Sequence, residues 1–187
     1  MEEKTFYPFP ELETERLMLR EVCPDDAESM FETFGNKEAM EYYGMHVHET
    51  VEDTNQLIER MQTNLEAGKS IRWAIVDKKS GKCIGTCGFH RLDEHKKRGE
   101  VGYEINPSLW RKGYMKEALH AIIYYGFEGF GFHRIEGIVL GNNEPSKQLL
   151  RKLNFTHEGS LTDRYYFRDR FWDEHYFGLI NPNGGVK

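Results

Sequence analysis

The sequence predicts a mixed α/β (α+β) protein with one mostly antiparallel sheet of about seven strands and about four flanking helices. Segments with strand-like alternation and segments with helical apolar spacing follow one another, and no linker rich in Pro, Gly or Ser separates them. A helical pattern between two strand patterns, over 100–140, implies a crossover and one parallel pair of strands. We therefore expect a single domain over residues 1–187, with its core at about 12–180.

The N-terminal part begins with a strand at 16–20, where apolar and polar residues partly alternate. Pro24 followed by two aspartates is typical of a helix start, because acidic groups suit the positive end of the helix dipole. A second helix is predicted over 53–65. Its apolar face consists of Leu57, Ile58, Met61 and Leu65.

Three strands separated by polar turns then predict an antiparallel meander. We place these strands at 71–76, 83–90 and 100–105. The remaining elements are a helix over 113–126, a strand at 134–140, a helix at 145–153, and strands at 155–161 and 171–179.

The composition excludes several classes of protein. The net charge of −6 lacks the basic surplus of a nucleic-acid binder and mildly favours a cationic partner such as an amine. Three cysteines, with no zinc-type Cys/His spacing, argue against a disulfide framework and a metal site. No signal-peptide pattern or membrane-length apolar stretch is present. We expect a cytoplasmic protein without metal, nucleic-acid or membrane partners, in which Cys83 and Cys87 are buried on one face of their strand.

A turn at 110–115 joins the end of a predicted strand to the start of a predicted helix. The first amides of a helix lack internal partners and carry the positive end of its dipole, so they suit a phosphate. Gly113 allows close backbone approach, and Arg111, Lys112 and Lys116 add positive charge. The turn differs from a P-loop, in which the lysine follows the glycine. A solvated helix cap is the alternative interpretation.

The pattern Gly-Tyr-x-Ile-x-Pro-x-x-Trp-Arg-Lys-Gly-Tyr-Met-x-Glu-Ala over 102–118 resembles the acetyl-CoA motif of the GNAT N-acetyltransferase superfamily. Segments 14–20, 143–146, 152–155 and 173–176 resemble signatures of its RimJ/RimL branch, named for ribosomal-protein N-terminal acetyltransferases. The resemblance spans about residues 12–180 and implies a GNAT-type acyl-CoA N-acyltransferase fold.

This resemblance implies acetyl-CoA as cosubstrate. The pantetheine arm would lie along 100–105, the diphosphate on the turn, and the lower part of the cofactor against the start of the following short helix. The implied binding residues are Val101, Gly102, Tyr103, Ile105, Arg111, Lys112, Gly113, Tyr114, Met115, Lys116, Asn143 and Ser146. Met115 replaces a usual Gly or Ala, Asn154 replaces a usual glycine, and Leu150 stands where many relatives have a tyrosine near the leaving thiolate. The leaving-group acid is therefore unassigned.

The implied reaction is direct attack of a neutral amine on the thioester. Glu104 is the first candidate for the base, directly or through water, and Glu100, with the same strand parity, is the second. Each is also explained as a solvent-facing carboxylate with a local ion pair. Ser146 is a candidate proton donor, and helix capping with a cofactor hydrogen bond is its alternative role.

The acceptor is expected between the two N-terminal helices and the last strands. Aromatic candidates for its walls are Tyr42, Tyr43, His46, Tyr165 and Trp172, for which core packing is the alternative. The leading function is acetylation of a protein N-terminal α-amine, with a ribosomal protein as the candidate acceptor. Its rivals are acetylation of a small amine (a polyamine, amino acid or aminoglycoside) and a non-catalytic acyl-CoA-binding module. A monomer or a homodimer is expected.

Overall fold

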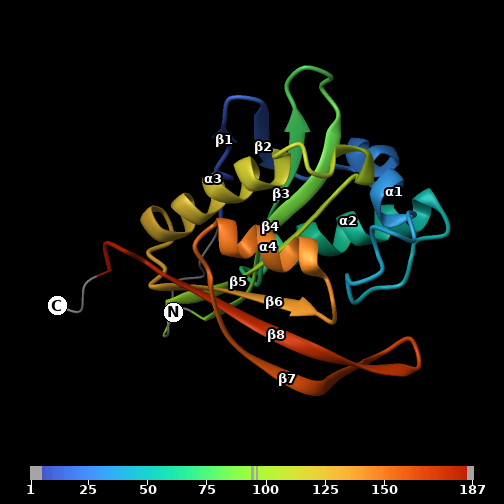
Figure 1. The fold of residues 1–187 in the computed structure, drawn as a ribbon. Coiled ribbons are helices and arrows are strands. Elements are labelled where there is room, and N and C mark those ends of the chain that lie inside the picture. Colours follow the sequence, from blue (N-terminus) through green and yellow to red (C-terminus); the bar gives the residue numbers. More distant parts are fainter. Residues whose placement is uncertain (1–5, 94, 96, 185–187) are drawn as a thin grey trace.

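The computed structural model describes residues 6–93, 95 and 97–184, and its strands form one eight-stranded sheet with the order β1-β2-β3-β4-β5-β6-β8-β7 (Figure 1). Every neighbouring pair is antiparallel except β5 and β6, as the predicted crossover requires. The two-residue β1 was not predicted, and β7 is longer than expected. The strands are β1 (Leu12–Glu13), β2 (Leu17–Glu21), β3 (Ile71–Asp77), β4 (Cys83–Asp93), β5 (Arg98–Ile105), β6 (Arg134–Leu140), β7 (Thr156–Phe167) and β8 (Arg170–Ile180).

Within the described part of the chain, four α-helices cover the sheet, two on each face. They are α1 (Ala27–Phe34), α2 (Val51–Glu66), α3 (Tyr114–Glu128) and α4 (Glu144–Lys152). Helices α3 and α4 lie together on the near face in Figure 1 and share an apolar cluster with Trp73 and Ile75 of β3. Helices α1 and α2 pack with Ala74 and Val76, the neighbouring residues of the same strand. Because successive strand residues face opposite ways, the two helix pairs lie on opposite faces.

The expectation that Cys83 and Cys87 share one face is wrong. Cys87 packs with the α3–α4 cluster, whereas Cys83 packs with the α1–α2 cluster. The strand register shifts between Ile75 and Val76, opposite this part of β4. Such an irregularity breaks the two-residue alternation of side chains, so spacing alone gives the wrong face.

An ion pair at the start of α1 makes stability depend on pH. Asp26 is 4% exposed and accepts hydrogen bonds from Arg20 Nη1 at 2.8 Å and Nη2 at 2.7 Å. Burial raises the pKa of Asp26, but the bonds from Arg20 and from the Cys23 backbone outweigh it, so the pKa is lowered. The stabilisation is therefore present above the ordinary pKa of an aspartate and is lost as pH falls through the lowered value.

We expect Asp26→Asn to lower the free energy of unfolding at pH 7 by about 2 kcal/mol, between the values for exposed and buried pairs. The variant should also lose less stability than the wild type between pH 6 and 3. Urea unfolding at several pH values measures both effects, with the exposed neighbour Asp25→Asn as control. An unchanged pH dependence would contradict the assignment.

Candidate active site

Strands β5 and β6 separate in the middle of the sheet. They pair only where Arg98–Glu100 meets Arg134–Glu136. Beyond this point β6 continues along β8 and β5 continues along β4, so the two neighbours diverge. The edge of β5 over 101–105 that faces β6 therefore has no strand partner among the described residues, and an extended chain can add to it through backbone hydrogen bonds. We call this opening the fork.

The turn at 110–115 lies between β5 and α3. Gly113 precedes the first residue of α3 with φ of 83°, a left-handed value, and no side chain caps the helix. Among the described residues other than its chain neighbours, Arg16 Nη2 alone would lie within 4 Å of a Cβ at Gly113, at 3.4 Å. Met115 is 8% exposed and packs into the core, so its bulk does not narrow the turn. The free amides and the space fit a phosphate group.

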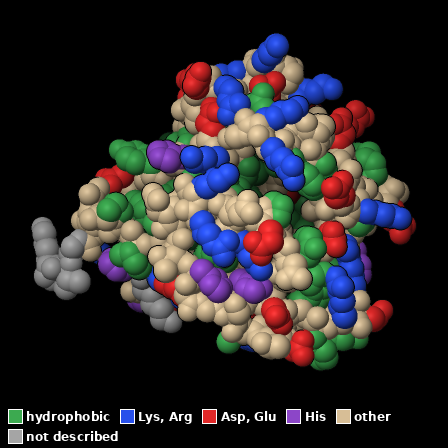
Figure 2. All heavy atoms as spheres, in the orientation of Figure 1, with side chains coloured by type: hydrophobic (Ala, Val, Ile, Leu, Met, Phe, Trp, Pro, Cys, Tyr) green, Lys and Arg blue, Asp and Glu red, His purple; other side chains and the backbone are tan. Residues whose placement is uncertain are grey.

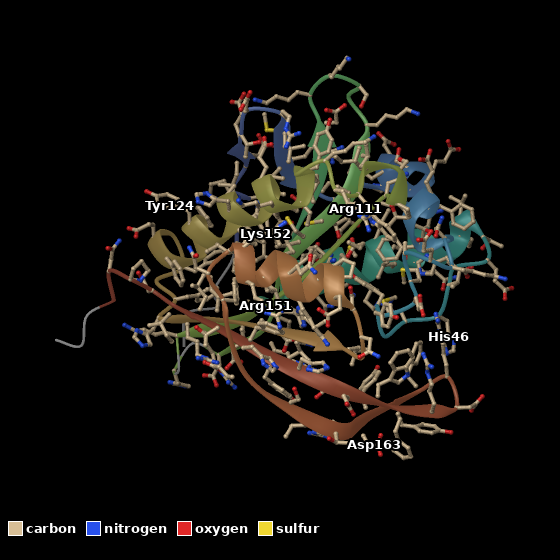
Figure 3. The ribbon with its side chains drawn as sticks, in the orientation of Figure 1. His46, Arg111, Tyr124, Arg151, Lys152 and Asp163 are labelled. Atoms are coloured by element: carbon tan, nitrogen blue, oxygen red, sulfur yellow. The ribbon has the colours of Figure 1, made fainter. Side chains whose placement is uncertain are left out.

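Positively charged side chains are concentrated on the face of the molecule that carries α3 and α4, although the chain is acidic overall. Figure 2 shows several Lys and Arg side chains on the face that carries α3 and α4, with few acidic ones among them. Figure 3 labels Arg111 beside the turn and Arg151 and Lys152 on α4. Such a face attracts an anionic ligand.

An ion pair that the sequence did not reveal holds the turn against β2. Arg16 donates through Nη1 to the Lys112 carbonyl oxygen at 3.0 Å and through Nε to Glu117 Oε2 at 2.6 Å. Its guanidinium also lies 4.2 Å from the ring centroid of Tyr114. Burial raises the pKa of Glu117, but hydrogen bonds from Thr14 and Arg16 outweigh it and lower the pKa. Both partners lie in the family-like motifs, yet they are about a hundred residues apart, so only the fold pairs them.

At the fork, a hydroxyl pair connects β5 to α4. The Tyr103 hydroxyl and Ser146 Oγ are 2.7 Å apart, and the Ser146 amide donates to Asn143 Oδ1 at 3.2 Å. Burial raises the pKa of Tyr103 to about 12, although its bond to Ser146 acts in the opposite direction. Leu150 is 1% exposed and packs in the core, where it approaches Gly137. The predicted residues Tyr103, Asn143 and Ser146 are thus brought together.

Glu104 is buried, which differs from the alternative explanation of a solvent-facing carboxylate. Its side chain is 3% exposed and forms an ion pair with Arg72 Nη2. Thr86 Oγ1 and the Tyr43 hydroxyl also donate to its oxygens. Its assignment as base stays a prediction, but these three donors occupy its oxygens.

Glu100 lies on the same face of β5 and is likewise paired. Its side chain is 11% exposed, with Oε1 3.1 Å from His90 Nε2 and Oε2 2.9 Å from Arg91 Nη1. Burial raises the pKa of Glu100, but His90 and Arg91 outweigh it, so the pKa is lowered. The local ion pairs expected for both carboxylates are therefore present, although neither carboxylate faces solvent.

The predicted acceptor walls meet near the turn between β7 and β8. Tyr42 packs its ring edge-on to Trp172 at 5.7 Å, and the Tyr165 hydroxyl donates to the Gly44 carbonyl at 3.3 Å. His46 lies 5.1 Å from the ring of Phe167, and Figure 3 shows it beside this hairpin. Tyr43 differs, because its hydroxyl reaches inward to Arg72 and Glu104. These walls lie on the side of the sheet that also carries Arg72, His90, Glu100, Gly102 and Glu104. We call this side the acceptor face.

Among the described residues, no helix is both long and apolar enough to cross a membrane. No group of three or more His, Cys, Asp or Glu side chains within this part of the chain is arranged to hold a metal ion.

Comparisons with known proteins agree with this geometry. A family profile described as "Acetyltransferase (GNAT) domain" matches residues 16–156. The uncharacterized N-acetyltransferase YoaA of Bacillus subtilis (strain 168) is 37% identical over 93% of this chain and 98% of its own length. A crystal structure of a GNAT-family acetyltransferase from Bacillus anthracis has a TM-score of 0.82 and 26% identity, covering 91% of this chain and 98% of that one.

More distant relatives include enzymes named for ribosomal proteins. The [Ribosomal protein uS5]-alanine N-acetyltransferase of Escherichia coli (strain K12) is 31% identical over 58% of this chain and 56% of its own length. GNAT acetyltransferases use acetyl-CoA, and the fork and the turn are a fitting place for its extended arm and its diphosphate. The chain therefore belongs to the GNAT superfamily, with relatives that support its RimJ/RimL-like branch, and it is an N-acetyltransferase.

Proposed function

We propose that the protein acetylates the N-terminal α-amine of a protein by direct attack of that amine on acetyl-CoA. The observation that carries this choice is the pairing of three carboxylates on the acceptor face around the fork. Glu100 is paired with Arg91 and Glu104 with Arg72, and Glu136 of β6 is paired with both Arg98 and Arg134. A polyamine carries several positive charges and requires unpaired carboxylates, whereas an α-amine carries a single charge.

The chemistry of the amine also favours an α-amine. Its ordinary pKa is about 7.7–8.0, against about 10.4 for a lysine-like amine, so near pH 7 a far larger share is neutral. The name of the E. coli relative, which acts on an alanine of ribosomal protein uS5, supports a ribosomal protein as the acceptor. Family membership alone does not fix an acceptor.

The proposed site uses the fork for the pantetheine arm and the turn for the diphosphate. Backbone groups of β5 over 101–105 would bind the arm, and the first amides of α3 would bind the diphosphate, with Arg111, Lys112 and Lys116 nearby. The Tyr103–Ser146 hydroxyl pair would donate a hydrogen bond to the leaving sulfur. A thiolate with an ordinary pKa of about 8.5 needs little acid assistance. The cytoplasmic location, the single domain and the monomeric or homodimeric state stay predictions.

A panel of amines tests the acceptor. Free-thiol release from acetyl-CoA would be followed with tripeptide amides that begin with alanine or serine, and with spermidine, lysine and kanamycin. We expect the peptides to have kcat/KM at least about tenfold above that of any other amine. An α-amine carries a single charge and is more often neutral near pH 7, so it does not need unpaired carboxylates on the acceptor face. Peptides with a blocked N-terminus and a free lysine are the control and should not react.

Two outcomes of the panel would contradict this proposal. Reaction with spermidine alone would replace the protein N-terminus by a small amine. Tight binding of acetyl-CoA without transfer to any amine would indicate a non-catalytic acyl-CoA-binding module.

A further inference from the structure

The imidazole of His90 lies over Gly102 on the acceptor face. In the β4–β5 register, His90 is opposite Glu100 and Gly88 is opposite Gly102. A Cβ at Gly102 would lie 3.2 Å from His90 Cε1 and 3.4 Å from His90 Nδ1. Gly102 is also on the segment of β5 that has left β6. The imidazole therefore lies beside the strand edge where an extended thioester would bind.

Hydrogen bonding leaves one nitrogen of His90 available. Nε2 lies 3.1 Å from Glu100 Oε1, so in the neutral ring Nε2–H donates to this carboxylate. Arg91 Nη1 donates to the other oxygen of Glu100 at 2.9 Å and fixes its orientation. No hydrogen bond to Nδ1 is present among the described residues. The side chain of His90 is 39% exposed, which allows an amine to approach that nitrogen.

The two carboxylates nearby, Glu104 and Glu100, accept hydrogen bonds at both of their oxygens. Glu104 is 3% exposed and accepts from Arg72, Thr86 and Tyr43. Both oxygens of Glu100 are occupied by His90 and Arg91. A general base needs a free lone pair within reach of the proton that it takes. Of these three groups, His90 combines an unbonded ring nitrogen with a side chain that is 39% exposed, whereas the side chains of Glu100 and Glu104 are 11% and 3% exposed.

We propose that His90 is the general base of the acetyl transfer and that Glu100 and Arg91 are positioning residues that hold its ring. The inference rests on the proposed transfer to an amine. A C–N bond forms between the amine nitrogen and the thioester carbonyl carbon, and a proton of that nitrogen passes to Nδ1. The C–S bond breaks, and its electron pair leaves with the sulfur. The sulfur then takes a proton from solvent, and His90 returns its proton to solvent.

The charged groups that face His90 come from three neighbouring strands. Glu100 of β5 contacts the imidazole and Arg91 of β4 contacts Glu100, while Arg72 lies on β3. Arg72 Nη1 lies 3.3 Å from the Cβ position of Gly102, on the same face as the imidazole. Farther along this face the charges of β5 and β6 are paired, as Arg98 with Glu136.

His90→Gln tests the inference, since glutamine keeps a donor for Glu100 but has no basic nitrogen. With the amine of the panel that reacts fastest, we expect kcat at pH 7 to fall about a hundredfold, the lower range for general-base catalysis. The Kd of coenzyme A, measured by calorimetry, should stay unchanged. The deficit should shrink at pH 9, where hydroxide is more abundant and can take the proton of the attacking nitrogen in place of the imidazole. A merely structural role would not produce this pH dependence.

Two further variants and the wild type complete the test. Glu100→Gln should lower kcat about tenfold, since the ring loses its carboxylate partner but keeps Nδ1. The exposed His133→Gln is the matched control and should retain full activity. A wild-type protein that acetylates none of the amines overturns the proposed function and this inference together. An active wild type with His90→Gln within threefold of it overturns the inference alone. A pH-dependent deficit in Glu104→Gln, and not in His90→Gln, would return the role of base to Glu104.

Discussion

Gly113→Asp is expected to weaken acetyl-CoA binding by at least about a hundredfold, which corresponds to about 3 kcal/mol. The new carboxylate would occupy the space of the diphosphate at the N-terminus of α3, where a Cβ would lie 3.4 Å from Arg16 Nη2. Two like charges about 4 Å apart near a protein surface repel by up to about 4 kcal/mol. A side chain at φ of 83° adds strain, because this left-handed value favours glycine.

Isothermal calorimetry with coenzyme A measures this loss directly. Gly113→Ala separates strain from charge, and we expect it to weaken binding less than about tenfold. Gly81→Asp is the matched control, because Gly81 also has a positive φ, of 71°, and open space around it. It lies in the turn between β3 and β4, away from the fork. An unchanged Kd for Gly113→Asp would show that the diphosphate binds elsewhere.

Those parts of the fold with a local signal were predicted well. The second helix begins where Thr50 accepts a hydrogen bond from the Asp53 amide, within three residues of the expected start. The meander and the crossover follow from turns and periodicity, and both are confirmed. Strand β1 has only two residues, too few for a periodic pattern. The full length of β7 was missed because its register shifts between Leu161 and Tyr165, which interrupts the alternation.

The candidate site was likewise predicted only where the sequence carries a local signal. A contiguous motif over 102–118 identified the turn, which the structure places at the open end of α3 beside the fork. Interactions between distant elements could not be predicted, because they depend on strand register. Glu104 lies opposite Thr86 and Glu100 lies opposite His90 only once β4 and β5 are paired. For this reason His90 looked like an ordinary polar strand residue in the sequence.

Arg72→Met is expected to lower the free energy of unfolding by about 3–5 kcal/mol, because it leaves the buried charge of Glu104 without its partner. The side chains of Arg72 and Glu104 are 15% and 3% exposed. Burial lowers the pKa of Arg72, but the charge of Glu104 outweighs it and raises the pKa, so the guanidinium stays protonated. Methionine fills similar volume, so a lost charge and not a cavity dominates the effect.

The second mutation of a double-mutant cycle distinguishes an unpaired charge from lost packing. Glu104→Gln in the Arg72→Met background removes the charge but keeps an acceptor for Thr86 and Tyr43, so about half of the lost stability should return. Arg134→Met is the control at the partly exposed pair with Glu158, where we expect a loss of about 1 kcal/mol or less. Urea unfolding of the wild type, the single variants Arg72→Met and Glu104→Gln, and the double variant gives the coupling energy. If the double variant is less stable than Arg72→Met alone, then Glu104 stabilises the fold without Arg72, and the acceptor face is held by the hydroxyls of Thr86 and Tyr43 instead of the ion pair.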